Sequence, residues 1–143
     1  MKILPKIGVD DIRLGSDKNY ILDNLGKPNE IVKEEGEELW RYDKGGLELC
    51  FQEDDRYLLS TITVFDKTAT LESKTIIGIG ESELVIEFPF FKLDDDFGEF
   101  GKDYNYNEKE LSVWVDDAGV RNITIFPEYD KSGERAIWPK AST

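Results

Sequence analysis

The stretch IRLGSDKNYILDNLG at residues 12–26 decides the fold, because it has a close parallel in IIGIGESELVIEFPF at residues 76–90. In both stretches an apolar residue and a glycine precede a short polar segment, and an amphipathic run follows. Ser16 or Asp17 is suited to cap a helix, because a short polar side chain accepts a free backbone N–H of the first turn. Gly26 then ends that helix. The pattern predicts one short helix in each half of the chain.

The parallel continues after the helices. WRYDKGGLELCF (40–51) matches DYNYNEKELSVWV (103–115), and the two halves close on STITVF (60–65) and NITIF (122–126). Corresponding residues lie 61 to 65 positions apart, so small insertions account for the drift. Such self-similarity is typical of duplicated units. The sequence therefore predicts an α+β fold, a tandem αβ repeat with its helices packed on one face of an antiparallel sheet.

We expect a single domain over residues 1–143, built from two repeats at about 1–66 and 75–130 with a short C-terminal tail. The polar segment 66–75 is predicted to connect the repeats, and the acidic segment 92–102 is predicted to be a loop. In the second repeat Glu81 or Ser82 is expected to cap the helix. Alternating apolar residues on the strands predict the core: Leu47, Leu49, Ile62, Val64, Leu111, Val113, Ile123 and Ile125.

Composition narrows the classes of protein. No apolar run reaches the roughly 18 residues that a membrane-spanning helix needs, and Asp10 and Asp11 interrupt any signal-peptide core. We therefore expect a cytoplasmic protein. The single cysteine, Cys50, lies between Leu49 and Phe51 and is expected to be a small buried residue rather than a nucleophile.

The chain has no histidine, and this removes the commonest general base and metal ligand and any Ser-His or Cys-His pair. The acidic run Asp94–Asp96 with Glu99 lacks the alternating acids and the bidentate glutamate of a calcium loop. We expect no metal, no cofactor and no catalytic residue. Carboxylates are plentiful, so an enzyme that uses two of them stays open as a lesser alternative.

The net charge of −13 indicates what the surface attracts. Nucleic-acid phosphates and anionic membranes would be repelled, whereas a basic protein would be steered towards the chain. The alternative is that the acidity serves solubility alone.

A partner-binding surface is predicted from aromatic residues on strands and from acids in loops. Aromatic residues are common on strands for packing reasons alone, but an exposed row of them would suit a protein interface. The aromatic candidates are Trp40, Tyr42, Tyr104, Tyr106 and Trp114. The acidic candidates are Asp54, Asp55, Asp94, Asp95, Asp96, Glu99, Asp116 and Asp117.

The chain resembles a known superfamily over nearly its whole length, through short structural motifs. The run from Ile12 to Gly15, then Ile21, Leu25, Gly26 and Pro28, followed by Trp40 and Tyr42, is similar to the pattern of the β-lactamase inhibitor protein and small outer-membrane assembly lipoproteins. The resemblance implies helix-plus-strand repeats and a binder that presents a concave sheet to another protein. The second repeat departs from it, because Phe90 and Phe91 stand where Leu25 and Gly26 stood. The chain also lacks the lipoprotein cysteine near residue 20.

These observations predict a non-catalytic protein-binding module. In its most specific form it is an immunity protein that binds and neutralises a basic bacterial toxin domain. The alternative is a generic inhibitor or scaffold protein of the same fold with no toxin partner.

Overall fold

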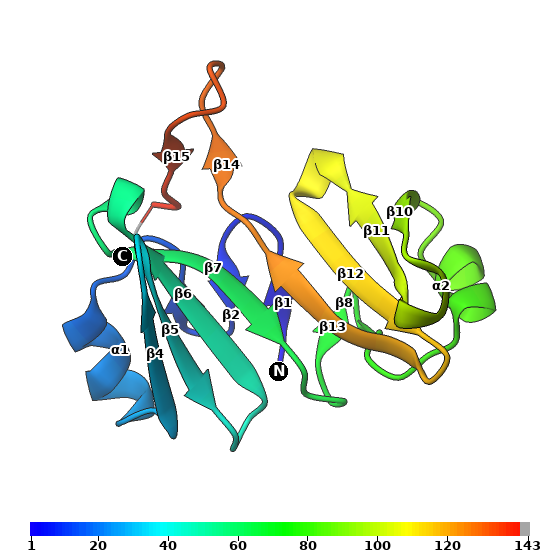
Figure 1. Cartoon of the computed structure of the whole chain (residues 1–143), viewed down its shortest axis with the longest axis horizontal. Coiled ribbons are helices and arrows are strands. Elements are labelled where there is room, and N and C mark those ends of the chain that lie inside the picture. The colour runs from blue at the N-terminus through cyan, green and yellow to red at the C-terminus, as the bar shows by residue number, and fades with distance from the viewer. Residues whose placement is uncertain (141–143) are drawn as a thin grey trace.

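A computed structural model describes residues 1–140 of the chain. Its centre is one antiparallel sheet of eight strands in the order β10-β11-β12-β13-β7-β6-β5-β4 (Figure 1). The strands are β4 (Glu30–Glu34), β5 (Glu37–Tyr42), β6 (Leu47–Gln52), β7 (Leu59–Val64), β10 (Lys92–Asp96), β11 (Lys102–Tyr106), β12 (Leu111–Asp116) and β13 (Gly119–Ile125). Helices α1 (Lys18–Leu25) and α2 (Glu81–Glu87) are both short. The fold is a sheet-rich α+β fold, as predicted.

The order of elements is the same in each half of the sheet. Helix α1 precedes the antiparallel strands β4 to β7, and α2 precedes the antiparallel strands β10 to β13. The last strands of the two sets, β7 and β13, pair antiparallel with Thr63 opposite Thr124. This single junction joins the two sets of four strands into one continuous sheet.

Helix α1 begins and ends where the sequence predicts. The side chain of Asp17 accepts a hydrogen bond from the backbone N–H of Tyr20 at 2.8 Å. At the other end Gly26 has a φ of 75° and donates its N–H to the carbonyl of Leu22 at 2.8 Å. A positive φ costs glycine little, so this residue is well suited to end the helix.

The start of α2 differs from the prediction. Gly80 is its N-cap and provides no side-chain cap, so Glu81 and Ser82 lie inside the first turn. Glu81 instead reaches across to β11, where its carboxylate accepts hydrogen bonds from Lys102 and Tyr104. At the start of α2 the side chain of Glu81 therefore contacts strand β11 and does not cap the helix.

Three small sheets accompany the large one. They are β1 (Ile3–Leu4), β2 (Gly8–Val9) and β3 (Ile12–Arg13); β8 (Thr70–Leu71) with β9 (Lys74–Thr75); and β14 (Glu128–Tyr129) with β15 (Ala136–Ile137). The predicted polar connection at 66–75 therefore contains a hairpin, and it buries Ala69 and Leu71. The predicted loop at 92–102 contains the edge strand β10 and the 3-10 turn Gly98–Phe100.

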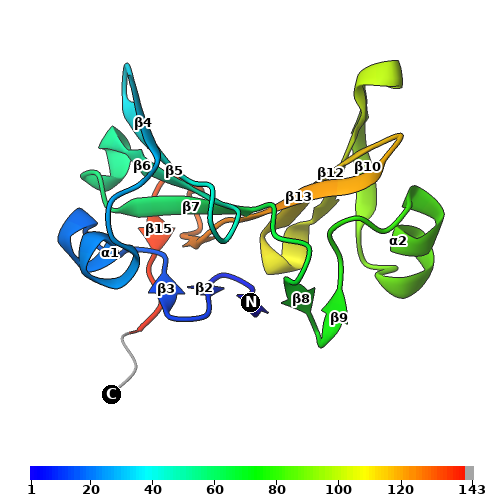
Figure 2. The same cartoon turned by 90° about the horizontal axis from the view of Figure 1, so that it is seen from below.

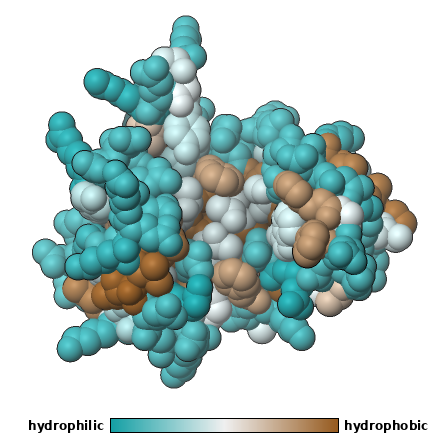
Figure 3. Space-filling view, in the orientation of Figure 1, coloured by the Kyte–Doolittle hydropathy of each residue, from teal (hydrophilic) through white to brown (hydrophobic). Residues whose placement is uncertain are grey.

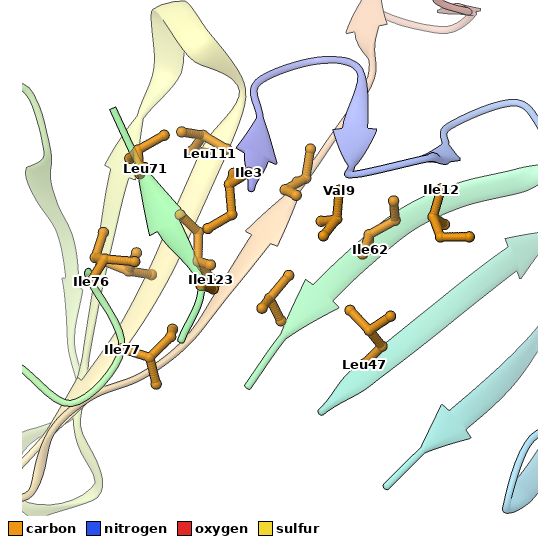
Figure 4. Packing of buried hydrophobic residues seen from close by; sticks show 14 of the residues in the cluster. Ile3, Val9, Ile12, Leu47, Ile62, Leu71, Ile76, Ile77, Leu111 and Ile123 are labelled. Atoms are coloured by element: carbon orange, nitrogen blue, oxygen red, sulfur yellow. The ribbon is translucent and has the colours of Figure 1, made fainter. Parts of the chain in front are cut away.

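The core forms against one face of the large sheet. All eight residues predicted for the core are buried, none more than 5% exposed. Figure 4 shows Val9 and Ile12 of the N-terminal strands beside Ile62 of the large sheet, and Ile3 beside Leu111 and Ile123. Each helix adds one fully buried residue, Ile21 in α1 and Leu84 in α2. The strand alternation predicted from the sequence is confirmed.

Candidate functional site

The large sheet has a second face, opposite the core, which we call the open face. Successive side chains of a strand point to opposite faces, so the residues that alternate with the core residues lie there. In Figure 2 the strands β4 and β10 at the two edges both rise to the same side of the central strands β7 and β13, so this face is concave. It faces the viewer in Figure 3, where hydrophilic surface surrounds brown and pale patches at the lower left and centre. The open face is a continuous surface that a partner could contact.

The open face carries more acids than bases. Strand register places seven carboxylates there: Glu30, Glu34, Glu37, Glu48, Asp95, Asp103 and Asp116. The same register places Arg41 and Lys92 there, and Arg121 joins them through its ion pair with Asp116. The guanidinium of Arg41 lies 3.3 Å from both Glu30 and Glu48, and Arg121 lies 3.1 Å from Asp116. The remaining carboxylates give this face a negative surplus.

An aromatic rim borders the open face at the turn between β10 and β11. Phe97 and Phe100 are 50% and 74% exposed, and the ring of Phe97 lies 5.5 Å from the ring of the half-buried Trp114. Gly101 has a φ of 132°, and a Cβ there would lie 2.7 Å from the Trp114 ring. The absence of a side chain at Gly101 therefore allows Trp114 to lie against the turn.

The aromatic candidates divide between core and surface. Trp40, Tyr42 and Tyr104 are 4%, 6% and 7% exposed and point to the core, so an exposed aromatic row does not exist at these positions. Tyr42 donates its hydroxyl to the carbonyl of Gly26 at 2.9 Å. These three aromatic side chains therefore lie on the buried face of the sheet and not on an exposed one. Only Trp114 lies on the open face.

Tyr106 has a different environment. It is half-buried, on the core side of β11, and its ring stacks on Phe90 with 5.3 Å between ring centroids. Phe91 contacts the same ring edge-on at 5.6 Å. Tyr106 therefore forms part of an aromatic cluster beside α2 and is not part of the open face.

The acidic candidates fall into separate places. Asp54 and Asp55 lie in the 3-10 turn Glu53–Asp55 between β6 and β7, in the half of the sheet that holds β4 to β7. The other six belong to the half that holds β10 to β13: Asp94, Asp95, Asp96, Glu99, Asp116 and Asp117. Asp94 to Asp96 are fully part of the edge strand β10, not of a loop as predicted. The structure thus brings together Trp114, Asp116 and the β10–β11 hairpin, but not Asp54 and Asp55.

Two polar clusters connect helices to strands on the core side of the large sheet. In one, Glu38 accepts hydrogen bonds from Lys18 and from the indole of Trp40, the latter at 3.2 Å. Burial acts to raise the pKa of Glu38, but the hydrogen bonds from Lys18 and Trp40 outweigh it and leave the pKa below its ordinary value. The ion pair with Lys18 stabilises the ionised form of this carboxylate.

In the second cluster Glu81 accepts hydrogen bonds from Tyr104 and from Lys102, whose Nζ lies 3.0 Å away. The hydrogen bond from Tyr104, followed by that from Lys102, lowers the pKa of Glu81. Burial and then the Glu81 carboxylate raise the pKa of Tyr104 to about 12. The lowered pKa values of Glu38 and Glu81 and the raised pKa of Tyr104 each favour the usual charge state of the group, and both clusters join a helix to a strand.

Cys50 is buried, as predicted. Burial, followed by the neighbouring Glu37 carboxylate, raises the pKa of its thiol to about 12, and its Sγ lies 3.4 Å from Glu37 Oε2. A thiol of this pKa is neutral at physiological pH and is a poor nucleophile. Among residues 1–140 no group of three or more Cys, Asp or Glu side chains is placed to hold a metal ion.

Sequence reasoning missed three residues that now stand out: Arg41, Phe97 and Phe100. Arg41 was recognisable only through its partners Glu30 and Glu48, which lie on separate strands. The two phenylalanines stand in the motif FGEFG at 97–101, whose spaced glycines indicate a tight turn. The sequence thus contains a turn signal inside the segment 92–102, which is predicted above only as an acidic loop.

Within the described part of the chain no helix is long and apolar enough to cross a membrane.

Comparisons with known proteins give a fold likeness only. No family model and no curated sequence matches the chain. Its structure is similar to that of a DUF4309 family protein, YjgB, from Bacillus subtilis, with 14% identity, 84% of each chain covered and a TM-score of 0.57. It is also similar to an extracellular protein containing an SCP domain from Bacillus anthracis, with 12% identity and a TM-score of 0.50. That match covers 99% of this chain and 56% of the other. At these identities the chain shares a fold with both proteins, and no residue role is carried over from either.

Proposed function

We propose that this chain is a non-catalytic protein-binding module that binds a positively charged protein on its open face. In its most specific form it is an immunity protein that neutralises a basic bacterial toxin domain. The observation that carries the proposal is the concave open face, which has seven carboxylates against three bases. A face of this kind attracts a basic partner over a long range and orients it on approach.

The proposal includes a tandem origin for the two halves. Two backbone contacts support it, because they recur at the same place in each half. Gly15 donates to the carbonyl of Leu59 at 2.8 Å, and Gly78 donates to the carbonyl of Val120 at 2.7 Å. The two donors are 63 positions apart and the two acceptors 61, within the offsets found in the sequence.

The helix–strand ion pairs support the same origin. Lys18, the first residue of α1, pairs with Glu38 of β5, whereas Glu81, the first residue of α2, pairs with Lys102 of β11. The helix residues are 63 positions apart and the strand residues 64. The two ion pairs occupy corresponding places. The helix provides the cation in the first half and the anion in the second.

The arrangement of the helices completes the proposed architecture. In Figure 2 both α1 and α2 lie below the central strands β7 and β13, on the side away from the rising edges β4 and β10. Each helix also buries an aliphatic residue, Ile21 or Leu84, into the core. Helices on one face leave the other free, and such a face is suited to binding.

The test compares two variants of equal net charge. Glu34→Gln, Glu37→Gln and Asp95→Asn together neutralise three acids on the open face, and none of the three forms an ion pair among residues 1–140. Asp23→Asn, Glu83→Gln and Glu134→Gln neutralise three exposed acids elsewhere. Wild type and both variants are immobilised, and proteins retained from the native organism are identified by mass spectrometry.

The proposal predicts one basic protein that wild type and the second variant retain and the open-face variant does not. Retention by all three forms alike would refute binding on the open face. The captured protein is then expressed with and without this chain. Toxicity that the chain suppresses supports an immunity role, whereas a harmless partner supports the alternative of a generic inhibitor or scaffold.

A further inference from the structure

The open face contains two pockets that correspond to each other. The first, of about 340 Å³, is lined by residues that include Arg41, Asp43, Glu48 and Phe65. The second, of about 240 Å³, is lined by residues that include Asp103, Asn105, Glu110, Ser112 and Phe126. Each lies beside the turn that joins two strands, one in each half of the sheet.

The linings correspond at all positions but one in each, since Tyr42 lines only the first pocket and Asp103 only the second. Arg41 and Asn105 are 64 positions apart, Glu48 and Ser112 are also 64 apart, and Phe65 and Phe126 are 61 apart. These are the offsets of the proposed repeat. The two pockets are therefore comparable sites, and the residues in which they differ indicate what each can bind.

The first pocket contains a guanidinium supplied by the chain itself. Arg41 lines it and lies 3.3 Å from Glu48 on one side and 3.3 Å from Glu30 on the other. Phe65, which is 43% exposed, provides an aromatic wall. This arrangement shows that a guanidinium fits on this face between two carboxylates, in a pocket that a phenylalanine also lines.

The second pocket has two acids of its own and an aromatic wall, but no cation among its lining residues. Asn105 stands where Arg41 stands in the first pocket, and neither Asp103 nor Glu110 takes part in an ion pair among residues 1–140. The hydroxyl of Ser112 donates to Asp103 Oδ1 at 2.7 Å and so fixes that carboxylate. This hydrogen bond fixes the orientation of the Asp103 carboxylate, and no cation among residues 1–140 forms an ion pair with it.

We propose that the second pocket binds an arginine side chain of the partner protein, in the role that Arg41 has in the first pocket. The inference rests on the proposed function, because it names the group of a basic partner that the open face recognises. A planar guanidinium donates two parallel hydrogen bonds to a carboxylate and stacks on an aromatic ring, here Asp103 and Phe126. An ammonium group offers neither the fork nor the flat surface, so lysine binds more weakly.

The test uses N-acetyl-arginine amide as the probe, with the complete chain labelled with ¹⁵N. We expect saturable shifts of the side-chain amides of Asn105 and Asn107 and of the backbone amide of Ser112. The citrulline analogue, which has the same shape without the charge, is expected to bind at least roughly tenfold more weakly, since a charged hydrogen-bonded pair contributes about 1.4 kcal/mol or more.

Three variants locate the site. Asp103→Asn is expected to weaken binding of the probe by roughly tenfold. Asn105→Arg, which supplies the chain's own guanidinium, is expected to abolish it. Asp43→Asn, a matched change in the first pocket, is expected to leave it unchanged. Probe shifts that never saturate, that are as large for citrulline, or that survive Asp103→Asn would overturn the assignment.

The outcome is separate from that of the proposed function. If a basic partner is captured on the open face but the probe does not bind beside Phe126, the arginine pocket is refuted and the proposed binding face is retained. Loss of both the captured partner and the probe site would remove both claims. If Asn105→Arg does not fold, Asp103→Asn and the citrulline analogue still decide the question.

Discussion

The hydroxyl oxygens of Thr63 and Thr124 lie 3.0 Å apart at the junction of β7 and β13, and the two residues are 61 positions apart in the chain. They are directly opposite each other in the register. The neighbouring pairs are Ile62 with Ile125 and Val64 with Ile123. In the proposed tandem repeat, Thr63 corresponds to Thr124, and the pair Ile62–Ile125 corresponds to the pair Val64–Ile123. The proposal therefore makes this junction an interface of one segment with its own counterpart, as in a two-fold symmetric dimer.

The threonine pair is expected to couple energetically. Thr63→Val and Thr124→Val keep the shape and the strand preference but each remove one hydroxyl of the bond. Each single variant should lose about 0.2–1 kcal/mol of unfolding free energy, and the double variant about as much as one single variant. Urea unfolding of all four proteins measures the coupling. Strictly additive losses would show that the hydroxyls do not interact.

The ion pair of Glu81 predicts a dependence of stability on pH. Hydrogen bonds from Tyr104 and Lys102 lower the pKa of Glu81 below its ordinary value of 4.5. The unfolded chain therefore binds this proton more readily, so the contribution of Glu81 to stability is present above about pH 4.5 and is lost as the pH falls through the folded pKa. Glu81→Gln lacks this contribution.

Urea unfolding between pH 3 and pH 7 tests the prediction. The difference in unfolding free energy between wild type and Glu81→Gln should be largest near neutral pH and should shrink on the acid side. Glu83→Gln, which removes an exposed carboxylate from the same helix, is the control. A difference that is the same at pH 3 and pH 7 would contradict the role given to Tyr104 and Lys102.

Cys50 is expected to be unreactive in the folded protein. With a thiol pKa of about 12, only roughly one molecule in ten thousand carries the thiolate at pH 8. The reagent 5,5′-dithiobis(2-nitrobenzoate) should react with the thiol slowly in native buffer and rapidly in denaturing urea. Fast reaction in native buffer would show that the cysteine is accessible and that its pKa is not raised.

Gly101 is expected to control the position of Trp114. Gly101→Ala places a Cβ 2.7 Å from the Trp114 ring and 2.8 Å from the carbonyl of Val115. We expect a loss of about 1–3 kcal/mol and a changed NMR shift of the Trp114 indole N–H. Gly98→Ala in the same turn meets no atom within 4 Å and has a φ of 65°, so it carries only the backbone cost. Equal effects of the two changes would contradict the steric account.

The sequence predicts those parts of the fold that depend on local pattern. Helix α1 follows from the capping side chain of Asp17 and the glycine at 26, and the core strands follow from their alternation. The edge strands β4 and β10 were not predicted. Their sequences, EIVKE and KLDDD, are rich in charge and have no apolar alternation. An edge strand forms because a neighbour supplies hydrogen bonds, and charges on it discourage further pairing.

The candidate site was predicted less well than the fold. Alternation along a strand shows which side chains share a face of the sheet, but it does not show whether that face is buried. Trp40 and Tyr42 share one side of β5, and the sequence gives no reason why that side should be buried until the core partners are known. A strand turned by one residue would place both side chains in solvent. Charge could be read from the sequence as a total of −13. Its division between the open face and the rest of the surface depends on tertiary structure.

Association kinetics test the central claim that the open face binds a basic partner. The captured partner is passed over immobilised wild type, the open-face variant Glu34→Gln/Glu37→Gln/Asp95→Asn and the charge-matched variant Asp23→Asn/Glu83→Gln/Glu134→Gln, at several salt concentrations. The account predicts that the open-face variant associates more slowly than the charge-matched variant, with the gap widest at low salt, where screening is weakest. Equal association rates for the two variants at every salt concentration would contradict it and would leave the acidity as a general property of the surface.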